Sequence, residues 1–394
     1  MLCGIAIAFI VLTRIQPNQT NLATPKVNPL SVSTENITET TLPAAKGFQE
    51  EQAVITPKQP EFQAEGKSAV AALQNKEIAI PHEKLQSQNK AAAEDSFDNE
   101  LRKNVLVSIK LAKSYINSYY SKNDYKGFLD WPSIAIYSAE RESAKKNEKS
   151  LEWKEKEIKQ GNDFDLSRAT DYQRSILGII SAGSNPKAFA GMNLVETVKK
   201  SQQVSGKFAD TIEGKGERLI NSHIWGIVSL YSAGEKVPAS DKAYNWLVSK
   251  QNSDGGFGIF TGAKSDLDMT AMALTAFSIL GKNSADRNVS RALEFLRSKQ
   301  TPDGGFEIYG QENPDTASTV VQGLIALEIN PVSKGWIKGT DKNMIDFIMS
   351  FQLADGGFSH ARGGEADMLA TARALTALTD YYYSKSVFQV MKER

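Results

Sequence analysis

From about residue 100 onward, helical patterns of two kinds alternate along the chain. In the segment 288–297 the apolar residues recur at helical spacing and leave the opposite face polar. The segment 268–277 (DMTAMALTAF) is instead apolar nearly all round and rich in small residues. That pattern is typical of a helix buried on both sides. We therefore expect the amphipathic helices outside and the small-residue helices inside.

Six helices of each kind are predicted. The expected inner helices cover residues 131–139, 171–180, 222–230, 268–277, 315–324 and 367–378. The expected outer helices cover residues 101–120, 144–160, 192–203, 240–251, 286–300 and 341–352. No segment shows sustained alternation of apolar and polar residues, so strands are not expected.

A seven-residue motif, Q-x-x-D-G-G-F, connects outer to inner helices. It occurs three times, and a worn fourth copy (QQVSGKF) begins at Gln202. The closing Phe residues of the four copies are 49, 49 and 52 residues apart, which marks an internal repeat. Six helical hairpins in succession are predicted to close into a ring, the all-α (α/α)6 toroid, over residues 99–394. The motif residues are Gln251, Asp254, Gly255, Gly256, Phe257, Gln300, Asp303, Gly304, Gly305, Phe306, Gln352, Asp355, Gly356, Gly357 and Phe358.

We interpret the motif as structural. Glycine accepts a positive φ and Asp bonds to its own backbone, so Asp-Gly-Gly predicts a turn. The Phe is expected to wedge between inner and outer helices, where full burial contributes ~1.5–3 kcal/mol. The Gln is expected to satisfy carbonyl groups at the end of the preceding outer helix.

In a ring of parallel inner helices, every helix N-terminus gathers at one rim. Acidic residues open three inner helices, where they either cap the helix or contact a ligand at the mouth of the ring. Aromatic residues and one histidine fall in comparable first turns, and the histidine is either a ligand contact or a core residue. The candidate ligand-binding residues are Trp131, Tyr172, His223, Trp225, Asp268, Asp315 and Asp367.

The motif, followed by D-M-T-A-M-A-L from Asp268, resembles the prenyltransferase/squalene-oxidase repeat of the terpenoid cyclase and protein prenyltransferase superfamily. That superfamily's fold is the (α/α)6 toroid. The segments 170–179 (TDYQRSILGI) and 185–196 (NPKAFAGMNLVE) are most similar to Gram-positive cell-surface toroid proteins. Those proteins mostly have no established activity and resemble the cobalamin-carrier toroid of intrinsic factor and transcobalamin. The resemblance therefore implies a bacterial surface protein.

The superfamily's chemistries can be compared with these residues. Protein prenyltransferases hold a catalytic zinc with Asp, Cys and His, but the predicted toroid contains no cysteine, so we expect no metal and no cofactor. Class II terpene cyclases protonate an alkene with the middle Asp of D-x-D-D-T-A. The corresponding stretch here offers Asp266 and Asp268, while Met269 replaces the last acid. We therefore expect no catalytic residue, unless the protein is cyclase-like and uses Asp268 with Asp266.

The sequence thus favours a non-catalytic binding or interaction module, with a small molecule or a cell-envelope partner at the mouth of the toroid. Two alternatives stay open. A terpene cyclase-like enzyme needs a dry, aromatic pocket beneath Asp268. A glycan-binding or glycan-active (α/α)6 protein needs stacked aromatic rings and paired carboxylates in its cavity.

Residues 1–98 differ in composition from the rest. The apolar run 2–12 is shorter than the ~20 residues that span a bilayer, so residues 1–15 are predicted to be a signal peptide or membrane anchor. Residues 16–98 are rich in Pro, Thr, Ser and Gln, which predicts a disordered linker. Together these segments indicate an extracytoplasmic protein, membrane-anchored or secreted, at the cell surface.

Charge and cysteine content exclude further classes. The chain has 46 basic and 46 acidic side chains, so no charge excess points to a nucleic-acid partner. Its single cysteine cannot form an internal disulfide or a multi-cysteine metal site.

Overall fold

The computed structural model describes residues 92–141, 145–161, 164–339 and 341–394, with side chains from residue 98 onward. The predicted anchor 1–15 and most of the predicted linker 16–98 lie outside the described residues. The described part contains 13 helices and four very short strands. Among these helices, none is both long and apolar enough to cross a membrane.

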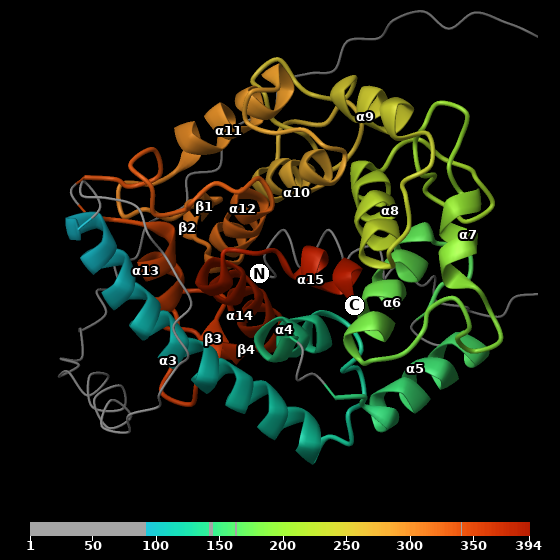
Figure 1. Cartoon of the computed structure of the whole chain (residues 1–394), viewed down its shortest axis with the longest axis horizontal. Coiled ribbons are helices and arrows are strands. Elements are labelled where there is room, and N and C mark those ends of the chain that lie inside the picture. Colours follow the sequence, from blue (N-terminus) through green and yellow to red (C-terminus); the bar gives the residue numbers. More distant parts are fainter. Residues whose placement is uncertain (1–91, 142–144, 162–163, 340) are drawn as a thin grey trace, which may run out of the picture.

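Six helices form an inner ring in chain order, each packed against the next, and the last packs against the first (Figure 1). The inner helices are α4 (Trp131–Glu140), α6 (Ala169–Ser181), α8 (Ile220–Ser232), α10 (Leu267–Ile279), α12 (Pro314–Ala326) and α14 (Met368–Tyr383). The outer helices are α3 (Ala92–Lys122), α5 (Glu148–Gln160), α7 (Leu194–Lys200), α9 (Ser240–Val248), α11 (Arg287–Lys299) and α13 (Met344–Met349). The predicted closed toroid is confirmed, with every inner helix at its expected place.

Contacts between the two ends of the described chain close the ring. The Gln352 side chain, in the last motif, donates to the Ser108 carbonyl of α3 at 3.0 Å across 244 residues of sequence. The Tyr381 hydroxyl bonds to Asp98, the residue immediately before the predicted domain. Helix α3 begins at Ala92, so it includes the last residues of the stretch assigned to the linker.

Small residues on the inner helices let those helices approach closely. At Gly323 of α12, a Cβ atom would lie 2.6 Å from the Ala271 carbonyl oxygen of α10. Side-chain caps fix where three of the inner helices begin. Asp266, Asn313 and Asp367 each accept a hydrogen bond from the backbone N–H three residues on.

The motif builds the turn that was predicted from its sequence. In the second copy, the Asp303 carboxylate accepts the Gly305 N–H at 3.3 Å, and Gly304 has a φ of +89°. Phe306 is fully buried, as are the Phe residues of the other three copies. The prediction for the Gln is wrong. Gln300 donates to the Gly304 carbonyl of its own turn at 2.8 Å and to the Trp336 carbonyl at 2.9 Å, not to the end of the preceding helix.

Strands were not expected, and this prediction is wrong in detail. Two antiparallel hairpins of two-residue strands lie between motif and inner helix, β1 (Glu307–Ile308) with β2 (Gln311–Glu312) and β3 (Phe358–Ser359) with β4 (Ala366–Asp367). Each leads from the motif Phe to the residue that caps the next inner helix. Two residues are too few to produce an alternating pattern, so the sequence carries no signal for them.

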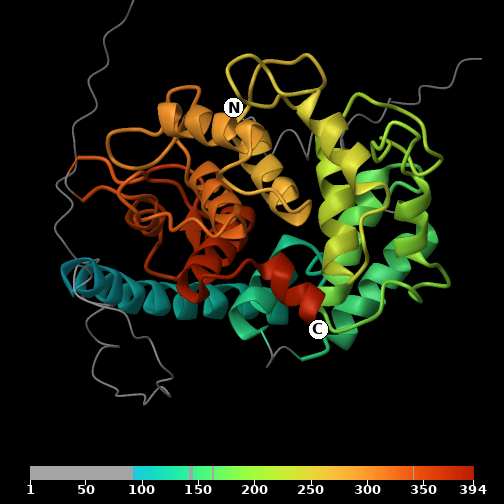
Figure 2. The ribbon, with the colours of Figure 1, turned by 45° about the horizontal axis from the view of Figure 1, so that its top comes forward.

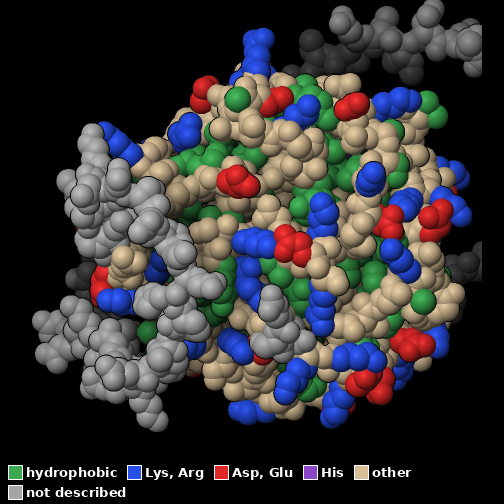
Figure 3. All heavy atoms as spheres, in the orientation of Figure 1, with side chains coloured by type: hydrophobic (Ala, Val, Ile, Leu, Met, Phe, Trp, Pro, Cys, Tyr) green, Lys and Arg blue, Asp and Glu red, His purple; other side chains and the backbone are tan. Residues whose placement is uncertain are grey.

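One helix was not predicted at all. Helix α15 (Val387–Glu393) lies inside the ring and packs against α8 and α4 (Figures 1 and 2). Its first N–H is accepted at 2.8 Å by the buried Asp380 carboxylate of α14, whose pKa burial raises well above its ordinary value. The Lys392 ammonium lies 4.4 Å from the centroid of the Tyr231 ring. Helix α15 therefore covers the centre of the ring near the C-terminal ends of the inner helices. Basic and acidic side chains are interspersed on the face shown in Figure 3.

Candidate functional site

A pocket occupies the centre of the ring, between the N-terminal halves of the inner helices and helix α15. It encloses a volume of about 60 Å³ within an atom-free space of about 910 Å³ that includes the part open to solvent. The pocket is therefore narrow for its extent. Its lining is mainly apolar: Trp131, Ile134, Asn221, Ile224, Trp225, Val228, Ile259, Asp266, Asp268, Met269, Met272, Thr275, Thr319, Gln322, Ala372, Arg373, Thr376 and Phe388.

Aromatic rings form one side of this pocket. The Trp131 and Trp225 rings lie with centroids 5.2 Å apart at an interplanar angle of 59°. The Phe388 ring of α15 meets Trp225 edge-on, with centroids 6.1 Å apart. Two of the aromatic residues proposed from the sequence, Trp131 and Trp225, are thus in contact in one pocket with Asp268.

Polar side chains recur at one position of three consecutive inner helices. Two residues after the cap position, α8 has Asn221, α10 has Asp268 and α12 has Asp315. These side chains are 3%, 4% and 2% exposed, respectively. One oxygen of each has no hydrogen-bond partner among the described residues. Buried polar oxygens are normally bonded, and those of Asn221 and Asp268 belong to pocket-lining residues.

Arg373 of α14 extends past α12 to reach Asp268. Its guanidinium lies 3.5 Å from one Asp268 oxygen, a long contact for an ion pair. Burial raises the pKa of Asp268 to about 7, and Asp266 and Asp315 add to the rise, whereas Arg373 and the nearby Thr316 hydroxyl oppose it. Burial also raises the pKa of Asp266. The pocket therefore holds a carboxyl group that changes charge near neutral pH.

Asp315 has a different partner. Its second oxygen lies 2.7 Å from His360 Nδ1, which comes from the loop after β3. Neither residue lines the central pocket. In the described part of the chain, no group of three or more His, Cys, Asp or Glu residues is placed to hold a metal ion.

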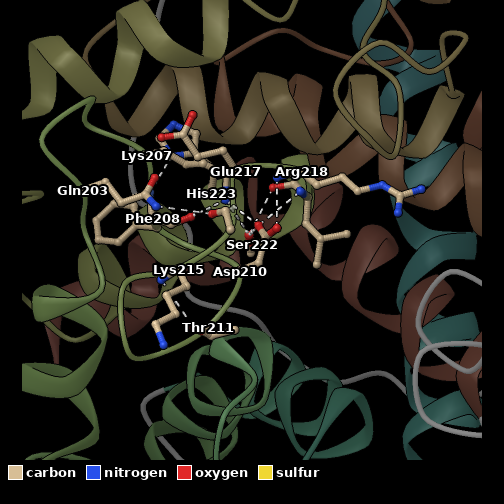
Figure 4. A network of polar contacts seen from close by, with 12 residues as sticks. Gln203, Lys207, Phe208, Asp210, Thr211, Lys215, Glu217, Arg218, Ser222 and His223 are labelled. Atoms are coloured by element: carbon tan, nitrogen blue, oxygen red, sulfur yellow. Dashed lines mark hydrogen bonds and ion pairs between the residues drawn. The ribbon is translucent and has the colours of Figure 1, made fainter. Parts of the chain in front are cut away.

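His223, proposed as a ligand contact or a core residue, belongs to the core (Figure 4). Its Nδ1 accepts the Phe208 N–H at 3.1 Å and its Nε2 bonds to the Ala243 carbonyl at 3.0 Å. The ring is fully buried against Trp246, and burial lowers its pKa to about 3. Because both nitrogens are occupied away from the pocket, His223 is removed from the candidate ligand residues.

His223 has equivalents in two other repeats. The Thr270 and Thr371 hydroxyls accept the N–H of Phe257 and Phe358 at 2.9 and 2.8 Å. His223 does the same for the Phe of the worn motif. Each of these acceptors stands four residues after its helix cap position, so an alignment of the repeats on the cap would have assigned His223 its structural role.

Lys207 completes the network around His223 (Figure 4). Its ammonium donates to Asp210 at 2.5 Å, to the Phe208 carbonyl at 2.8 Å and to the Ser222 hydroxyl at 3.2 Å. Burial lowers the pKa of Lys207, and its hydrogen bond to Asp210 opposes that shift. Lys207 and Ser222 are both fully buried. Neither side chain can contact a substrate, so their role is structural.

Two further candidates also lie away from the pocket. Tyr172 is buried against Phe164, and its hydroxyl donates to the Leu166 carbonyl at 3.1 Å. Asp367 is an exposed helix cap. Asp367 therefore occupies the same cap position as Asp266, not the position of Asp268. In α14, the position that corresponds to Asp268 is occupied by Leu369.

Asn221, Arg373 and Phe388 are among the pocket residues that sequence reasoning missed. Asn221 was detectable, because it stands in the worn repeat where Asp268 stands in the next. Arg373 and Phe388 carried no such signal. Arg373 reaches the pocket only because the ring places α14 next but one to α10, beyond α12, and Phe388 only because α15 folds back into the ring.

Fold and pocket together agree with one family. The chain belongs to the prenyltransferase alpha-alpha toroid domain family, whose model matches residues 110–258 and 217–384. A comparison with curated proteins finds no match.

Solved structures with similar folds differ in activity. A Candida albicans protein geranylgeranyltransferase-I is 14% identical, with 72% of this chain and 98% of that chain covered and a TM-score of 0.49. A type II terpene cyclase from Scytonema is 10% identical, with coverages of 73% and 99% and a TM-score of 0.49. An unsaturated glucuronyl hydrolase from Bacillus sp. GL1 is 12% identical, with coverages of 70% and 96% and a TM-score of 0.47. At these identities the likeness concerns the fold alone.

Proposed function

We propose that the toroid is a binding module that holds a small ligand in its central pocket and does not transform it. The observation that carries this proposal is the pair of buried oxygens, on Asn221 and Asp268, that have no partner among the described residues although they line an aromatic pocket. Apolar pockets with a few convergent polar groups are the usual form of a small-molecule site. A ligand in this pocket would supply the missing hydrogen bonds.

The acid strength of Asp268 argues against the cyclase alternative. The pocket is apolar and aromatic beside Asp268, as a cyclase requires. Alkene protonation also requires a strong acid, whereas burial raises the pKa of this carboxyl to about 7 and so makes it a weaker one. Met269 lines the pocket where the cyclase motif has its last acid. These residues support binding over alkene protonation.

The shape of the pocket argues against the glycan alternative. Asp266 and Asp268 both line it together with tryptophan, so carboxylates and aromatic rings are present. The enclosed volume of the pocket is only about 60 Å³, however. Such a narrow space suits a flat or chain-like group better than linked sugar rings.

A ligand screen by thermal shift on the full chain tests the binding function. Every compound that raises the melting temperature is repeated on Met272→Trp, which fills the pocket, and on Met349→Trp, where a comparable half-buried methionine ends α13 outside it. We expect the stabilisation to disappear in Met272→Trp and to persist in Met349→Trp. Equal stabilisation of both variants would place the ligand elsewhere, and turnover of a bound compound that Asp268→Asn abolishes would make the protein an enzyme.

The proposed location rests on the N-terminal sequence. We propose that residues 1–98 export the toroid and tether it outside the cytoplasm, because an apolar run precedes a long polar stretch. A fusion of residues 1–98 to alkaline phosphatase, which is active only after export, tests this in a bacterial host. Phosphatase activity that is lost when residues 2–12 are deleted is the expected result, and activity that survives the deletion would refute it.

A further inference from the structure

The ligand class can be narrowed from the polar atoms of the pocket, on the assumption that the proposed binding function holds. Two of the unpartnered atoms, one oxygen each of Asn221 and Asp268, are acceptors, and one, the Trp225 indole N–H, is a donor. The parent side chains are 3%, 4% and 8% exposed. Leaving such atoms unsatisfied is costly, so the two acceptors favour a ligand with hydrogen-bond donors.

The charged side chains that line the pocket favour a ligand with a positive charge. Its lining includes two carboxyl groups, Asp266 and Asp268, and one guanidinium, Arg373. With both carboxyl groups ionised, the lining carries one excess negative charge in an apolar surrounding. The contact of Arg373 with Asp268 involves only one of the two Asp268 oxygens and is 3.5 Å long. A single positive charge next to the other oxygen would compensate the excess.

The aromatic rings supply a second feature that favours a cation. Trp131 and Trp225 both line the pocket, with ring centroids 5.2 Å apart. Tryptophan faces attract an ammonium group, and the attraction is strongest when the cation is desolvated. The remaining lining, which includes Val228, Met272 and Phe388, offers an apolar surface for the body of the ligand.

We propose that the pocket binds a primary ammonium compound with a slender apolar body, whose ammonium group donates to the free oxygens of Asp268 and Asn221 beside the two tryptophan rings. The body of the ligand extends between Val228, Met272 and Phe388. One acceptor atom on it, such as a hydroxyl oxygen, can pair with the Trp225 N–H.

This arrangement gives ligand binding a defined pH dependence. The charged groups that face Asp268 are Asp266 on its own helix, Arg373 on α14 and Asp315 on α12, with His360 bonded to Asp315. The pKa of the free Asp268 carboxyl is about 7. A bound cation favours the ionised form, so ammonium affinity should rise about tenfold between pH 6 and pH 8.

Three probes of similar shape test the proposal by calorimetric titration of the full chain at pH 8. They are n-butylammonium, the neutral 1-butanol and the anionic pentanoate. We expect the ammonium to bind about tenfold more tightly than either of the others. Asp268→Asn and Asn221→Leu should each weaken ammonium binding about tenfold, and Asp268→Asn should also abolish its pH dependence while leaving the affinity of the alcohol within about threefold.

Asp367→Asn is the matched control, since Asp367 also stands at the start of an inner helix but is exposed and outside the pocket. It should leave all three affinities unchanged. Equal or tighter binding of the alcohol or the carboxylate would overturn the ammonium proposal and leave the binding function intact. Failure of all three probes to bind overturns the ammonium proposal as well, whereas the binding function is judged separately by the pocket-filled Met272→Trp variant.

Discussion

In the C-terminal half of the ring, each motif turn carries two glycines before its Phe, whereas in the worn turn 202–208 the second glycine is replaced by Lys207. A Cβ at Gly305 would overlap the Phe347 ring, so no side chain fits there. In the worn turn the Lys207 ammonium instead lies 5.4 Å from the centroid of the Trp246 ring. The second glycine is crowded in the other two intact turns as well, by Ser265 at Gly256 and by Ala366 at Gly357, whereas the worn turn leaves room for a side chain.

The intact and the worn repeats also differ in the side chain that accepts the backbone N–H of the motif Phe. We call the three repeats with an intact motif the clean repeats. The motif Phe N–H is accepted by a threonine hydroxyl in two of the clean repeats and by His223 in the worn repeat. The Phe is fully buried in all four copies. All four copies keep the buried ring, and in three of them a side chain accepts the Phe N–H. The identity of the acceptor side chain is free to change.

The largest effect expected is loss of the buried ring. Phe306→Ala should destabilise the protein by about 3–5 kcal/mol through the cavity it leaves. Phe208→Ala should cost a similar amount, because the worn turn buries its Phe equally well. Urea unfolding measures both, and a loss below about 1 kcal/mol for Phe208→Ala would show that the worn turn is not equivalent.

Removal of the lysine unique to the worn turn should have the next largest effect. Lys207→Met leaves Asp210 and Ser222 without their buried cation, which should cost about 2–3 kcal/mol. Lys215→Met, at an exposed lysine of the same region, is the matched control and should change stability by less than about 0.5 kcal/mol. Equal effects of the two substitutions would mean that the network does not hold the worn turn.

His223 should make the worn repeat sensitive to acid. Its folded pKa of about 3 lies below the ordinary value of 6.5, so the unfolded chain binds the proton more tightly. The stability contributed by neutral His223 is present above pH 6.5 and falls as the pH is lowered, by about 2 kcal/mol between pH 7 and pH 5. His223→Thr, which installs the acceptor of the clean repeats, should remove this part of the pH dependence. An unchanged difference between variant and wild type from pH 8 to pH 5 would contradict the buried neutral histidine.

Asp268 should make stability depend on pH in the opposite direction to His223, and by a smaller amount. Its folded pKa of about 7 lies above the ordinary 3.8, so the folded protein holds the proton more tightly and loses stability as the pH rises from about 4 to 7. Asp268→Asn should therefore gain about 1–2 kcal/mol relative to wild type between pH 6 and pH 8. Asp367→Asn should show no such gain in the same urea titrations.

The repeat explains why so much of the fold was predictable. Helical spacing and the position of the motif placed all six inner helices, because each is fixed by local contacts that recur about every fifty residues. The two-residue strands lay beyond reach because two residues give no alternating pattern, and α15 because it depends on packing against distant parts of the ring. The site was predicted only in part for a related reason. An Asp that caps a helix and an Asp two residues further on look alike in sequence, so Asp367 was aligned with Asp268 although their surroundings differ.

The charge state of Asp268 tests the central claim, that this residue belongs to a desolvated ligand pocket, most directly. Carbon-13 NMR of the aspartate carboxyl groups in the full chain, with Asp268→Asn to assign the signal, follows its titration with and without a compound that binds the toroid. We predict titration near pH 7 in the free protein and a shift in that pKa when the compound binds, with the Asp367 signal unaffected. Titration near the ordinary pKa of 3.8, unchanged by the compound, would contradict the assignment of the pocket as the functional site.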